Sequence, residues 1–525
     1  MSIDWTDLLG RDRINLADCL VQRHVREGHG ARRALLHGHR TCSYAELAAD
    51  IARSARVLRE RGMRRGDRVL LAVPDSPAFV VAFFAVLSGG GVAVLTNPLL
   101  PAADIAYQAR HLGARLAVAY HGVLDKLAEL RDDGVAVVSC GDGDADRGEF
   151  ERAAATQPTQ FDCEPTAAAD LAYVLFSSGT TGRPKAIPRR HRDILHCARA
   201  FGDEILGLRS DDVTLAVPKL TFGYALGGSL LFSFVAGAAA VVFPARSTAT
   251  SVAEQLNRHR PSIFLGTPRI IAELLKTRQT DGLGRLRIAT SAGEALPPSV
   301  LAHWGGLIAA PLVDGFGSTE AGHIFLSNAP LDVRPGTCGR SLSGFRTKLI
   351  DATGQEVGAG QTGRMCIAGP SVASEYLNDP HRSAECYDGE WHISSDLFSC
   401  QDGVYTYVGR ADDMVKRGCG EWVSPYEVED ELLKLPTVLE CAVVGSHTPG
   451  GTIGLKAYVV ASRDTPAGQR LANALIEHTR LRWPDFPHKH LDDIEFLEAL
   501  PRNTSGKIQR QLLRQQTLTE FSYDC

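Results

Sequence analysis

One segment, Tyr173-Val-Leu-Phe-Ser-Ser-Gly-Thr-Thr-Gly-Arg-Pro-Lys185, joins an apolar run to a loop rich in glycine and hydroxyl groups. The run is aromatic and β-branched, which is typical of a buried strand. Glycines let backbone N–H groups turn toward a ligand, hydroxyls add hydrogen-bond donors, and Lys185 adds positive charge. The loop lacks the Gly-Lys-Ser/Thr ending of a Walker loop. The segment predicts a strand that runs into a phosphate-binding loop, and the alternative is a solvated turn.

Apolar strands alternate with helical patterns before this segment. Strands are predicted at 69–73 and 92–95, with a helix at 78–87 between them, and further strands follow at 116–119 and 135–138. Wholly apolar strands separated by helices indicate an α/β fold with parallel-rich sheets that are covered on both faces.

Length and composition predict at least two domains in a reducing compartment. The 525 residues are 44% hydrophobic, so the chain can bury large cores, and its length exceeds what one core usually serves. The net charge is -5 with no strongly basic tract, so we expect small-molecule or protein partners and no nucleic acid. The 12 cysteines include no CxxC pair. Neither a zinc site nor a disulfide framework is therefore indicated, and a cytoplasmic location fits best.

The stretch 224–245 contains no charged residue and has the length of a membrane span. Glycines at 227, 228 and 237 interrupt it, and the run 238–243 resembles a short buried strand. We expect a helix, a turn and a strand in a protein core, with a membrane span as the alternative.

Two helix starts carry the pattern of a capping box, in which a hydroxyl and a carboxylate cap one another's backbone N–H groups. Ser43 and Glu46 precede apolar residues at helical spacing. Ser424 and Glu427 repeat the pattern, with Pro425 at the first helical position.

A domain boundary is predicted near residue 409. A β-rich run, at 391–396 and 404–408, gives way there to the charged connector Gly409-Arg-Ala-Asp-Asp413. We therefore expect a large N-terminal domain, 1–409, and a small α+β domain, 410–525. The elements expected in the small domain are strands at 441–444, 455–460 and 494–497 and a helix at 468–481.

Three further segments carry chemistry at the ends of predicted strands or in loops. Strands at 262–267 and 286–294 end in small residues, which leave room for a ligand at the carboxyl edge of a sheet. Glu320 follows Ser318 and Thr319, and a carboxylate beside hydroxyls suits Mg²⁺ on a triphosphate, although it also suits a helix start. Lys507 lies on a polar glycine loop. There it is either a compact charge for a reacting anion or a solvated side chain.

Together these stretches resemble the adenylate-forming superfamily of acyl-CoA ligases, adenylation domains and luciferases. The resemblance covers nearly the whole chain, and the motifs follow the family's order. They lie at 177–185, 293–295, 315–320, 395–396, 409–413 and 503–507. The resemblance implies a large domain of parallel-rich sheets with a β-rich subdomain, which binds ATP and an acid, and a small, mobile C-terminal lid.

The resemblance also implies a role for each matching residue. Glu320 would bind Mg²⁺, Thr319 would contact phosphate, and Lys507 would bridge the attacking carboxylate and the α-phosphate. Asp412 would be the hinge of the small domain. The implied ATP-binding residues are Ser177, Ser178, Gly179, Thr180, Thr181, Gly182 and Lys185 at the phosphates, Gly293, Glu294, Ala295, Asp314 and Phe316 at adenine, and Asp396 and Arg410 at the ribose.

Within the superfamily the chain most resembles benzoate-type aryl-CoA ligases. The matching residues are Lys219 to Gly228, Gly317 to Asn328, Trp422 to Pro425 and Gly506 to Arg510. Candidate acid-binding residues are Tyr224, Gly317, His323 and Ile324, and candidate residues of the thiol tunnel are Gly418, Gly420 and Trp422. Small residues at Gly223, Ala225, Gly228 and Gly322 predict a pocket wider than benzoate needs, and the segment 416–422 is one residue longer than the family pattern.

The predicted function is ATP-dependent activation of an aromatic or bulky apolar carboxylic acid to an acyl-adenylate, followed by transfer to coenzyme A. The alternative acceptor is the phosphopantetheine of a separate carrier protein, because the chain has no carrier motif of its own. A non-catalytic nucleotide-binding protein is disfavoured, since Lys507, Glu320 and Asp396 are all present. The oligomeric state is not set by the sequence, and a homodimer stays open.

Overall fold

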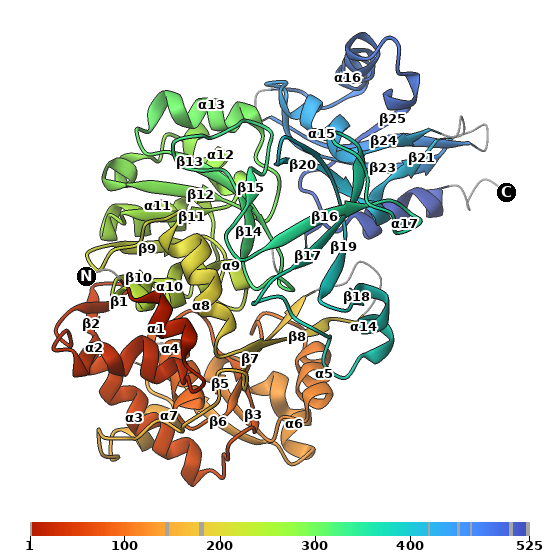
Figure 1. Cartoon of the computed structure of the whole chain (residues 1–525). Helices are drawn as coiled ribbons and strands as arrows, with labels where there is room; N and C mark the ends of the chain where they lie inside the picture. The colour runs from red at the N-terminus through yellow and green to blue at the C-terminus, as the bar shows by residue number, and fades with distance from the viewer. Residues whose placement is uncertain are drawn as a thin grey trace.

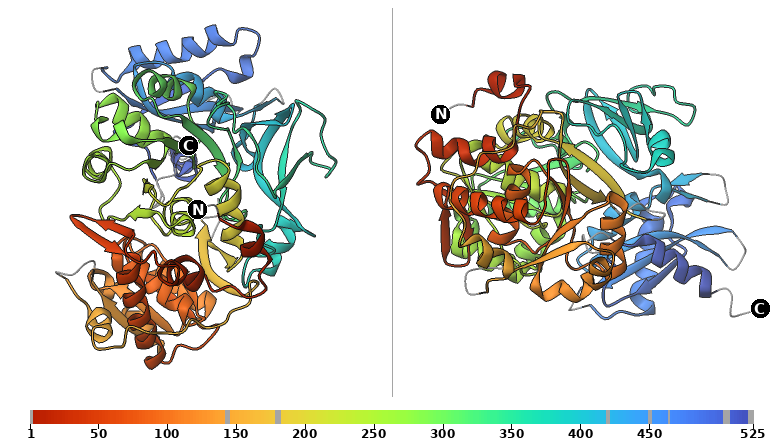
Figure 2. Two further views of the ribbon diagram at one scale, coloured as in Figure 1. Left: turned by 60° about the vertical axis from the view of Figure 1, so that its left-hand side comes forward. Right: turned by 90° about the horizontal axis from the view of Figure 1, so that it is seen from below.

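The computed structural model describes residues 3–141, 146–177, 183–417, 421–448, 452–462, 465–502 and 508–520, with side chains described up to residue 515. Figure 1 shows α/β layers built from the first two thirds of the chain, a β-rich sheet in teal, and a C-terminal lobe in blue. We use "C-terminal lobe" for the elements between residues 415 and 520. In the additional views of Figure 2 this lobe stays at one edge of the molecule.

The first α/β layer contains the segment 173–185. Its strand order is β6-β5-β3-β4-β7-β8, and its pairs are parallel except β7 with β8. The strands are β3 (Arg68–Ala72), β4 (Val92–Leu95), β5 (Leu116–Tyr120), β6 (Ala136–Cys140), β7 (Leu171–Ser177) and β8 (Lys185–Arg190). Successive strand residues alternate between the two faces, so Leu71 packs with α3 (Tyr44–Glu60) and α4 (Pro77–Ser88), and Leu70 packs with α5 (Ala102–Leu112). Shorter helices are α6 (Ala128–Asp132) and α7 (Glu149–Ala154).

The second α/β layer has the order β15-β14-β13-β12-β11-β9-β10-β1-β2. Its strands are β1 (Arg33–His37), β2 (Arg40–Ser43), β9 (Val213–Ala216), β10 (Ala239–Val241), β11 (Ile263–Gly266), β12 (Ile288–Ser291), β13 (Leu312–Gly317), β14 (Ile324–Ser327) and β15 (Arg340–Ser341). The run from β1 to β13 is parallel, and the pairs at the two edges are antiparallel. One face is covered by α11 (Ala249–His259), α12 (Pro268–Lys276) and α13 (Pro298–Leu307). The predicted parallel-rich α/β fold is confirmed.

The uncharged stretch 224–245 lies in this layer and forms the helix, turn and core strand that its glycines predict. It forms α9 (Gly223–Ala225), the π-helical turn η4 (Leu226–Leu231) and α10 (Phe232–Ala236), and it then enters β10. Gly237 ends α10 with a φ of 73°, a conformation that favours glycine. No helix in the described part of the chain is long and apolar enough to cross a membrane.

The remaining strands form an antiparallel sheet and the C-terminal lobe. The antiparallel sheet contains β16 (Arg346–Ile350), β17 (Thr362–Ala368), β18 (Tyr387–Asp388), β19 (Trp391–Gln401) and β20 (Val404–Arg410), with α14 (Pro380–Cys386) beside it. The lobe contains the pair β21 (Val415–Lys416) and β22 (Trp422–Val423), the sheet β23 (Val438–His447), β24 (Ile453–Ala461) and β25 (Asp493–Phe496), and α15 (Pro425–Leu433), α16 (Gln469–Arg482) and α17 (Arg510–Glu520). The boundary at 409 and 410 falls at the end of β20 and stays a prediction.

The two predicted capping boxes have different outcomes. At α3 the box is present, because the Ser43 backbone N–H donates to Glu46 Oε2 at 2.8 Å and the Glu46 N–H donates to Ser43 Oγ at 3.3 Å. At α15 the prediction is wrong. Ser424 Oγ donates instead to the carbonyl of Val408 in β20, and the Glu427 carboxylate accepts a 2.6 Å hydrogen bond from Lys489. The hydroxyl therefore ties the start of the lobe to β20.

Candidate active site

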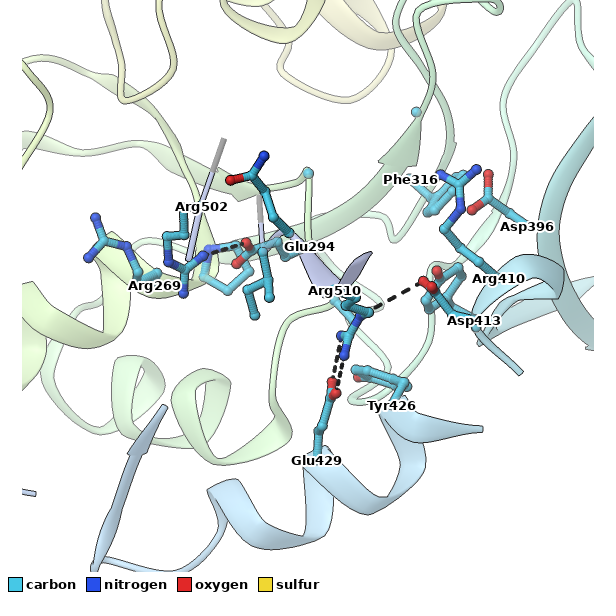
Figure 3. Close-up of a pocket in the computed structure, with 18 of the residues that line it drawn as sticks. Arg269, Glu294, Phe316, Asp396, Arg410, Asp413, Tyr426, Glu429, Arg502 and Arg510 are labelled. Carbon is cyan, nitrogen blue, oxygen red and sulfur yellow. Dashed lines mark hydrogen bonds and ion pairs between the residues drawn. The ribbon is translucent and has the colours of Figure 1, made fainter. Parts of the chain in front are cut away.

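A cleft of about 2590 Å³ lies between the carboxyl ends of the parallel strands and the C-terminal lobe. It brings together predicted residues from distant parts of the chain: Ser177, Lys185, Gly293, Glu294, Ala295, Asp314, Phe316, Gly317, Thr319, Glu320, Asp396, Arg410 and Asp412. The lobe adds Arg502 and Arg510, and Figure 3 shows both pointing toward carboxylates at the edge of the cleft. Parallel strands place their carboxyl ends at one edge of a sheet, which explains why the residues after β12 and β13 meet here, and the antiparallel sheet adds Asp396 and Arg410.

Eight predicted site residues lie outside the described residues. They are Ser178, Gly179, Thr180, Thr181 and Gly182 in the phosphate loop, Gly418 and Gly420 in the expected thiol tunnel, and Lys507. The loop's flanking residues, Ser177 and Lys185, are described, and they pair with each other across the antiparallel strands β7 and β8. The phosphate-loop segment therefore connects the ends of two strands that open onto the cleft.

A hydrogen-bonded group surrounds Glu320. The hydroxyl of Tyr376 donates to Glu320 Oε1 at 2.9 Å, and Lys185 Nζ donates to the Tyr376 hydroxyl at 3.3 Å. His392 Nε2 lies 3.4 Å from the same hydroxyl. Because that hydroxyl has a single proton, which it gives to Glu320, His392 is the donor in its contact. Tyr376 thus links the candidate metal ligand to the candidate phosphate-binding lysine.

The charge on Glu320 is favoured by these neighbours. Burial acts to raise the pKa of its carboxyl, but the electrostatic effects of His392 and of Lys185, together with hydrogen bonds that include the one from Tyr376, outweigh burial, and the pKa lies below its ordinary value. Burial lowers the pKa of His392, so this ring is neutral at pH 7 and Lys185 supplies the lasting positive charge. An ionised carboxylate at the cleft suits a hard cation.

A single protein carboxylate suits Mg²⁺ better than a metal that needs a full set of side-chain ligands. Within the described ranges, no three His, Cys, Asp or Glu side chains gather as a metal site. Mg²⁺ keeps several waters and binds substrate phosphates, so it needs few protein ligands. Glu320 fits that pattern.

Arg189 fixes the backbone that carries Thr319 and Glu320. Its fully buried guanidinium, on β8, donates to the carbonyl of Thr319 at 2.7 Å, to that of Glu320 at 2.9 Å and to that of Ser371 at 2.5 Å. Gly322 follows with a φ of 96°, and a Cβ there would lie 2.9 Å from Arg189 Nη1. Sequence reasoning missed Arg189, Tyr376 and His392, because no local pattern marks them.

The opposite wall of the cleft offers a carboxylate and an arginine. Ser394 Oγ donates to Asp396 Oδ2 at 2.6 Å and accepts from the Asp396 backbone N–H at 2.9 Å, so a serine two residues earlier orients the carboxylate. Asp396 on β19 pairs with Arg410 on β20 across the sheet. Figure 3 shows the two side chains next to each other.

A slot suitable for a flat ring lies beside them. Phe316 stacks on Tyr407 with ring centroids 5.5 Å apart and meets Phe398 edge-on at 4.9 Å. Gly293 has a φ of 93°, and a Cβ there would meet nothing within 4 Å. Asp314 is buried, which raises its pKa well above the ordinary value, and among the described residues its Oδ1 has no hydrogen-bond partner. A buried polar atom without a partner is able to bind a polar ligand group.

The candidate acid-binding residues lie behind the cleft wall. Tyr224, His323 and Ile324 do not line the cleft itself, whereas Gly317 does. The Tyr224 hydroxyl shares a 2.5 Å hydrogen bond with Thr290, and His323 Nε2 donates to the Tyr224 carbonyl at 3.1 Å. Burial lowers the pKa of His323 to about 4, so its ring is neutral at pH 7. The ring lies 5.2 Å from Phe201 and 4.6 Å from Phe232, which makes this an uncharged, aromatic environment.

Two of the glycines expected to widen this pocket do not widen it. A Cβ at Gly228 would lie 2.3 Å from Leu265 Cδ2, so a neighbouring side chain already fills that space. At Gly322 the Arg189 side chain fills the space, as described above. Only Gly223 has room, with Leu175 Cδ1 at 3.4 Å. Ala225 is fully buried in the core. The inference from Gly228 and Gly322 was therefore wrong.

Arg510 of the C-terminal lobe lines the cleft. Arg510 Nη2 donates to Glu429 Oε2 at 2.8 Å, and its Nε lies 3.8 Å from Asp413 Oδ2, one residue after the candidate hinge (Figure 3). Trp422 is 56% exposed and is not among the residues that line the cleft.

The fold and the cleft define an adenylate-forming enzyme. Comparison with protein families gives the same result: residues 21–377 match the AMP-binding enzyme family, and residues 427–507 match the AMP-binding enzyme C-terminal domain. The chain belongs to the AMP-binding enzyme family.

The similar known proteins include several aryl-CoA ligases. The chain is 38% identical to benzoate–CoA ligase of Thauera aromatica over 96% of each protein. It is 35% identical to 4-hydroxybenzoate–CoA/benzoate–CoA ligase of Rhodopseudomonas palustris, over 96% of this chain and 94% of the relative. The crystal structure of the anthranilate CoA ligase AuaEII in complex with anthranoyl-AMP matches with a TM-score of 0.92 and 32% identity, over 99% of this chain and all of that one. The predicted resemblance to benzoate-type ligases is confirmed.

Proposed function

We propose that the protein activates an aromatic carboxylic acid with ATP and transfers the acyl group to coenzyme A. The observation that carries the proposal is one cleft in which an ionised Glu320, Lys185 and Asp396 lie together, with a buried, uncharged aromatic cluster behind its wall at Gly317. The first three suit a nucleoside triphosphate, and the apolar surroundings of the cluster suit an aryl ring. The relatives' activity as aryl-CoA ligases supports the same assignment.

Activation is needed because a carboxylate is a poor electrophile. In the first half-reaction a carboxylate oxygen bonds to the α-phosphorus, the bond to the pyrophosphate oxygen breaks, and pyrophosphate leaves with the electron pair. In the second, the thiol sulfur of coenzyme A bonds to the acyl carbon, its proton passes to solvent, and AMP leaves. Both steps depend on holding the reacting atoms in line and on placing positive charge where negative charge develops.

Residues on both sides of the cleft align the reacting atoms and supply the positive charge. The phosphate loop from Ser177 to Lys185 and Thr319 hold the β- and γ-phosphates, and Glu320 holds Mg²⁺, which neutralises charge on the triphosphate when bound. Tyr376 and Arg189 keep Glu320 in place through the contacts at its side chain and its backbone. The proposed role of Lys507, outside the described residues, is to neutralise the α-phosphate and the attacking carboxylate.

The remaining roles concern the nucleoside and the acid. We assign Asp396 and Arg410 to the ribose hydroxyls. Asp314 and Phe316, with the chain at 293–295, enclose adenine. The unpartnered Asp314 Oδ1 and the open space at Gly293 support this assignment. Tyr224, His323 and Ile324, with Gly317, surround the aryl ring. A Cβ at Gly317 would lie 2.7 Å from the His323 carbonyl, so glycine permits close packing of β13 on β14 at this point.

In our proposal the small domain, 410–525, turns about Asp412 between the half-reactions, so that one cleft serves two reactions. Gly418, Gly420 and Trp422 belong to the path of the thiol after that rotation. Trp422 is exposed in the present arrangement, so in our proposal it lines the thiol path only after the lobe has rotated.

Mass spectrometry of products tests the proposal. The protein is incubated with ATP, Mg²⁺ and a panel of benzoate, hydroxybenzoates, 2-aminobenzoate and larger apolar acids, with and without coenzyme A. We expect acyl-CoA, AMP and pyrophosphate for at least one aryl acid. Acyl-AMP that accumulates regardless of coenzyme A would identify a carrier protein as the acceptor instead. The absence of any acid-dependent product across the panel would refute the proposed function.

A further inference from the structure

A chain of ion pairs crosses the cleft at a place that none of the proposed roles explains. Arg502, on the C-terminal lobe, places Nη1 3.3 Å from Glu294 Oε1 on the loop after β12. Its Nη2 lies 2.8 Å from Glu440 Oε2 on β23 of the lobe. The Arg502 side chain is 15% exposed, and Figure 3 shows it reaching across to Glu294.

The same lobe carboxylate makes a second, longer contact with the α/β layers. Glu440 Oε1 lies 3.9 Å from Arg269 Nη1, near the start of α12. Glu440 is 21% exposed and Glu294 34%, so these charges are only partly screened by water. The Arg502–Glu294 contact is therefore the shorter and less exposed of two electrostatic bridges between the lobe and the α/β layers.

Arg502 also stands at the base of the segment that carries Lys507. Arg502 and Ile508 form an antiparallel bridge, and the Gln509 N–H donates to the Pro501 carbonyl at 2.8 Å. Both ends of the segment 503–507 are thus held together. The contact of Arg502 with Glu294 therefore anchors the base of the segment that carries Lys507.

The other end of the contact belongs to the nucleotide wall. Glu294 lies between Gly293 and Ala295, whose backbone borders the proposed adenine slot. An ion pair from this loop to Arg502 sets the distance between the adenine wall and the base of the Lys507 segment. The likeness of the whole chain to a structure solved with anthranoyl-AMP supports an arrangement of lobe and layers that holds an adenylate.

We infer that Arg502 is a positioning residue for the first half-reaction: its ion pair with Glu294 holds the C-terminal lobe in the arrangement in which the acid is adenylated. The inference rests on the proposed function. Rotation of the lobe separates Arg502 from Glu294 while the pair with Glu440, within the lobe, persists. Arg502 therefore contributes to adenylation and not to thioester formation.

The test measures the two half-reactions separately in the full-length protein. Adenylation is followed by acid-dependent exchange of pyrophosphate into ATP, and thioester formation by acyl-CoA production from supplied acyl-adenylate. Arg502→Gln and Glu294→Gln are each expected to slow adenylation about tenfold, an effect between that of losing an exposed ion pair and that of losing a buried one. Arg502→Gln is expected to change thioester formation by less than about twofold.

A double-mutant cycle shows whether the two side chains act on each other. If they act as a pair, Arg502→Gln/Glu294→Gln loses little more adenylation than the worse single variant, and independent effects would multiply to about a hundredfold. Lys489→Ala is the matched control. It breaks an ion pair of similar exposure, 2.6 Å to Glu427, that lies entirely within the lobe. It is expected to leave both half-reactions within about twofold of wild type.

The outcomes separate this inference from the function on which it rests. Equal losses in both half-reactions, or multiplicative losses in the cycle, would overturn the role of Arg502. A wild-type protein without pyrophosphate exchange for any acid would instead refute the proposed function. If Arg502→Gln does not fold, Arg502→Lys takes its place, because lysine keeps the positive charge but lacks the planar fork that contacts Glu294 and Glu440 together, and slower adenylation with unchanged thioester formation is again the expected result.

Discussion

Tyr376→Phe removes one hydroxyl from the group around Glu320 and keeps the ring. The hydroxyl donates to Glu320 Oε1 at 2.9 Å, and the Tyr376 side chain is 1% exposed. A hydrogen bond to a charged group contributes about 1.5–3 kcal/mol, because the carboxylate otherwise loses a donor that water does not replace. We therefore expect a loss of about 2 kcal/mol in stability at pH 7, and a fall of roughly 2 °C in the melting temperature.

The loss depends on pH in a defined direction. The folded pKa of Glu320 lies below its ordinary value of 4.5, so the hydrogen bond stabilises the charged form. This contribution is fully present above the unfolded pKa and is lost as the pH falls through the folded pKa. The difference in melting temperature between wild type and Tyr376→Phe should therefore be constant from neutral pH to about pH 5 and should shrink below pH 4.5.

The assay is thermal unfolding of both proteins across that pH range, followed by circular dichroism. Tyr405→Phe is the matched control, because the Tyr405 hydroxyl shares a 2.9 Å hydrogen bond with the uncharged Thr347 in the antiparallel sheet. It should cost only about 1 kcal/mol and show no change near pH 4.5. A Tyr376→Phe loss that equals the control, or one that stays constant through pH 4, would refute the argument that Tyr376 stabilises a charged Glu320.

Three further predictions address the cleft. Lys507→Ala should abolish pyrophosphate exchange but largely spare thioester formation from supplied acyl-adenylate, and equal loss of both steps would contradict its role. Asp396→Asn should raise the KM for ATP roughly tenfold or more, because a ribose hydroxyl loses a charged acceptor; an unchanged KM in the exchange assay would remove Asp396 from the site. Gly228→Ala should destabilise the protein by about 1–3 kcal/mol, since the new Cβ would meet Leu265 at 2.3 Å. A melting temperature equal to wild type would show that this space is free.

Local sequence patterns predicted most of the fold, because they depend on contacts between near neighbours. Alternating apolar runs and helices predicted the strands β3 to β7, and the Ser43–Glu46 pair predicted the start of α3. The described residues of the family's motifs also converged on one cleft: those after β7, β12 and β13 lie at the ends of these strands, and Asp396 and Arg410 reach it from the antiparallel sheet. The sequence by itself thus determined the layers, the family and the motif residues that line the cleft.

Only the tertiary structure decided which side chains support those residues. Arg189, Tyr376 and His392 reach Thr319 and Glu320 from segments that are distant in sequence, and nothing near them in the chain indicates a shared site. Long-range contacts also overrode two predictions made from local sequence patterns. The Ser424 hydroxyl donates to the Val408 carbonyl of β20 instead of capping α15, and Leu265 fills the space beside Gly228. A hydroxyl bonds to whichever acceptor the packing brings within reach, and that choice is made by the whole fold.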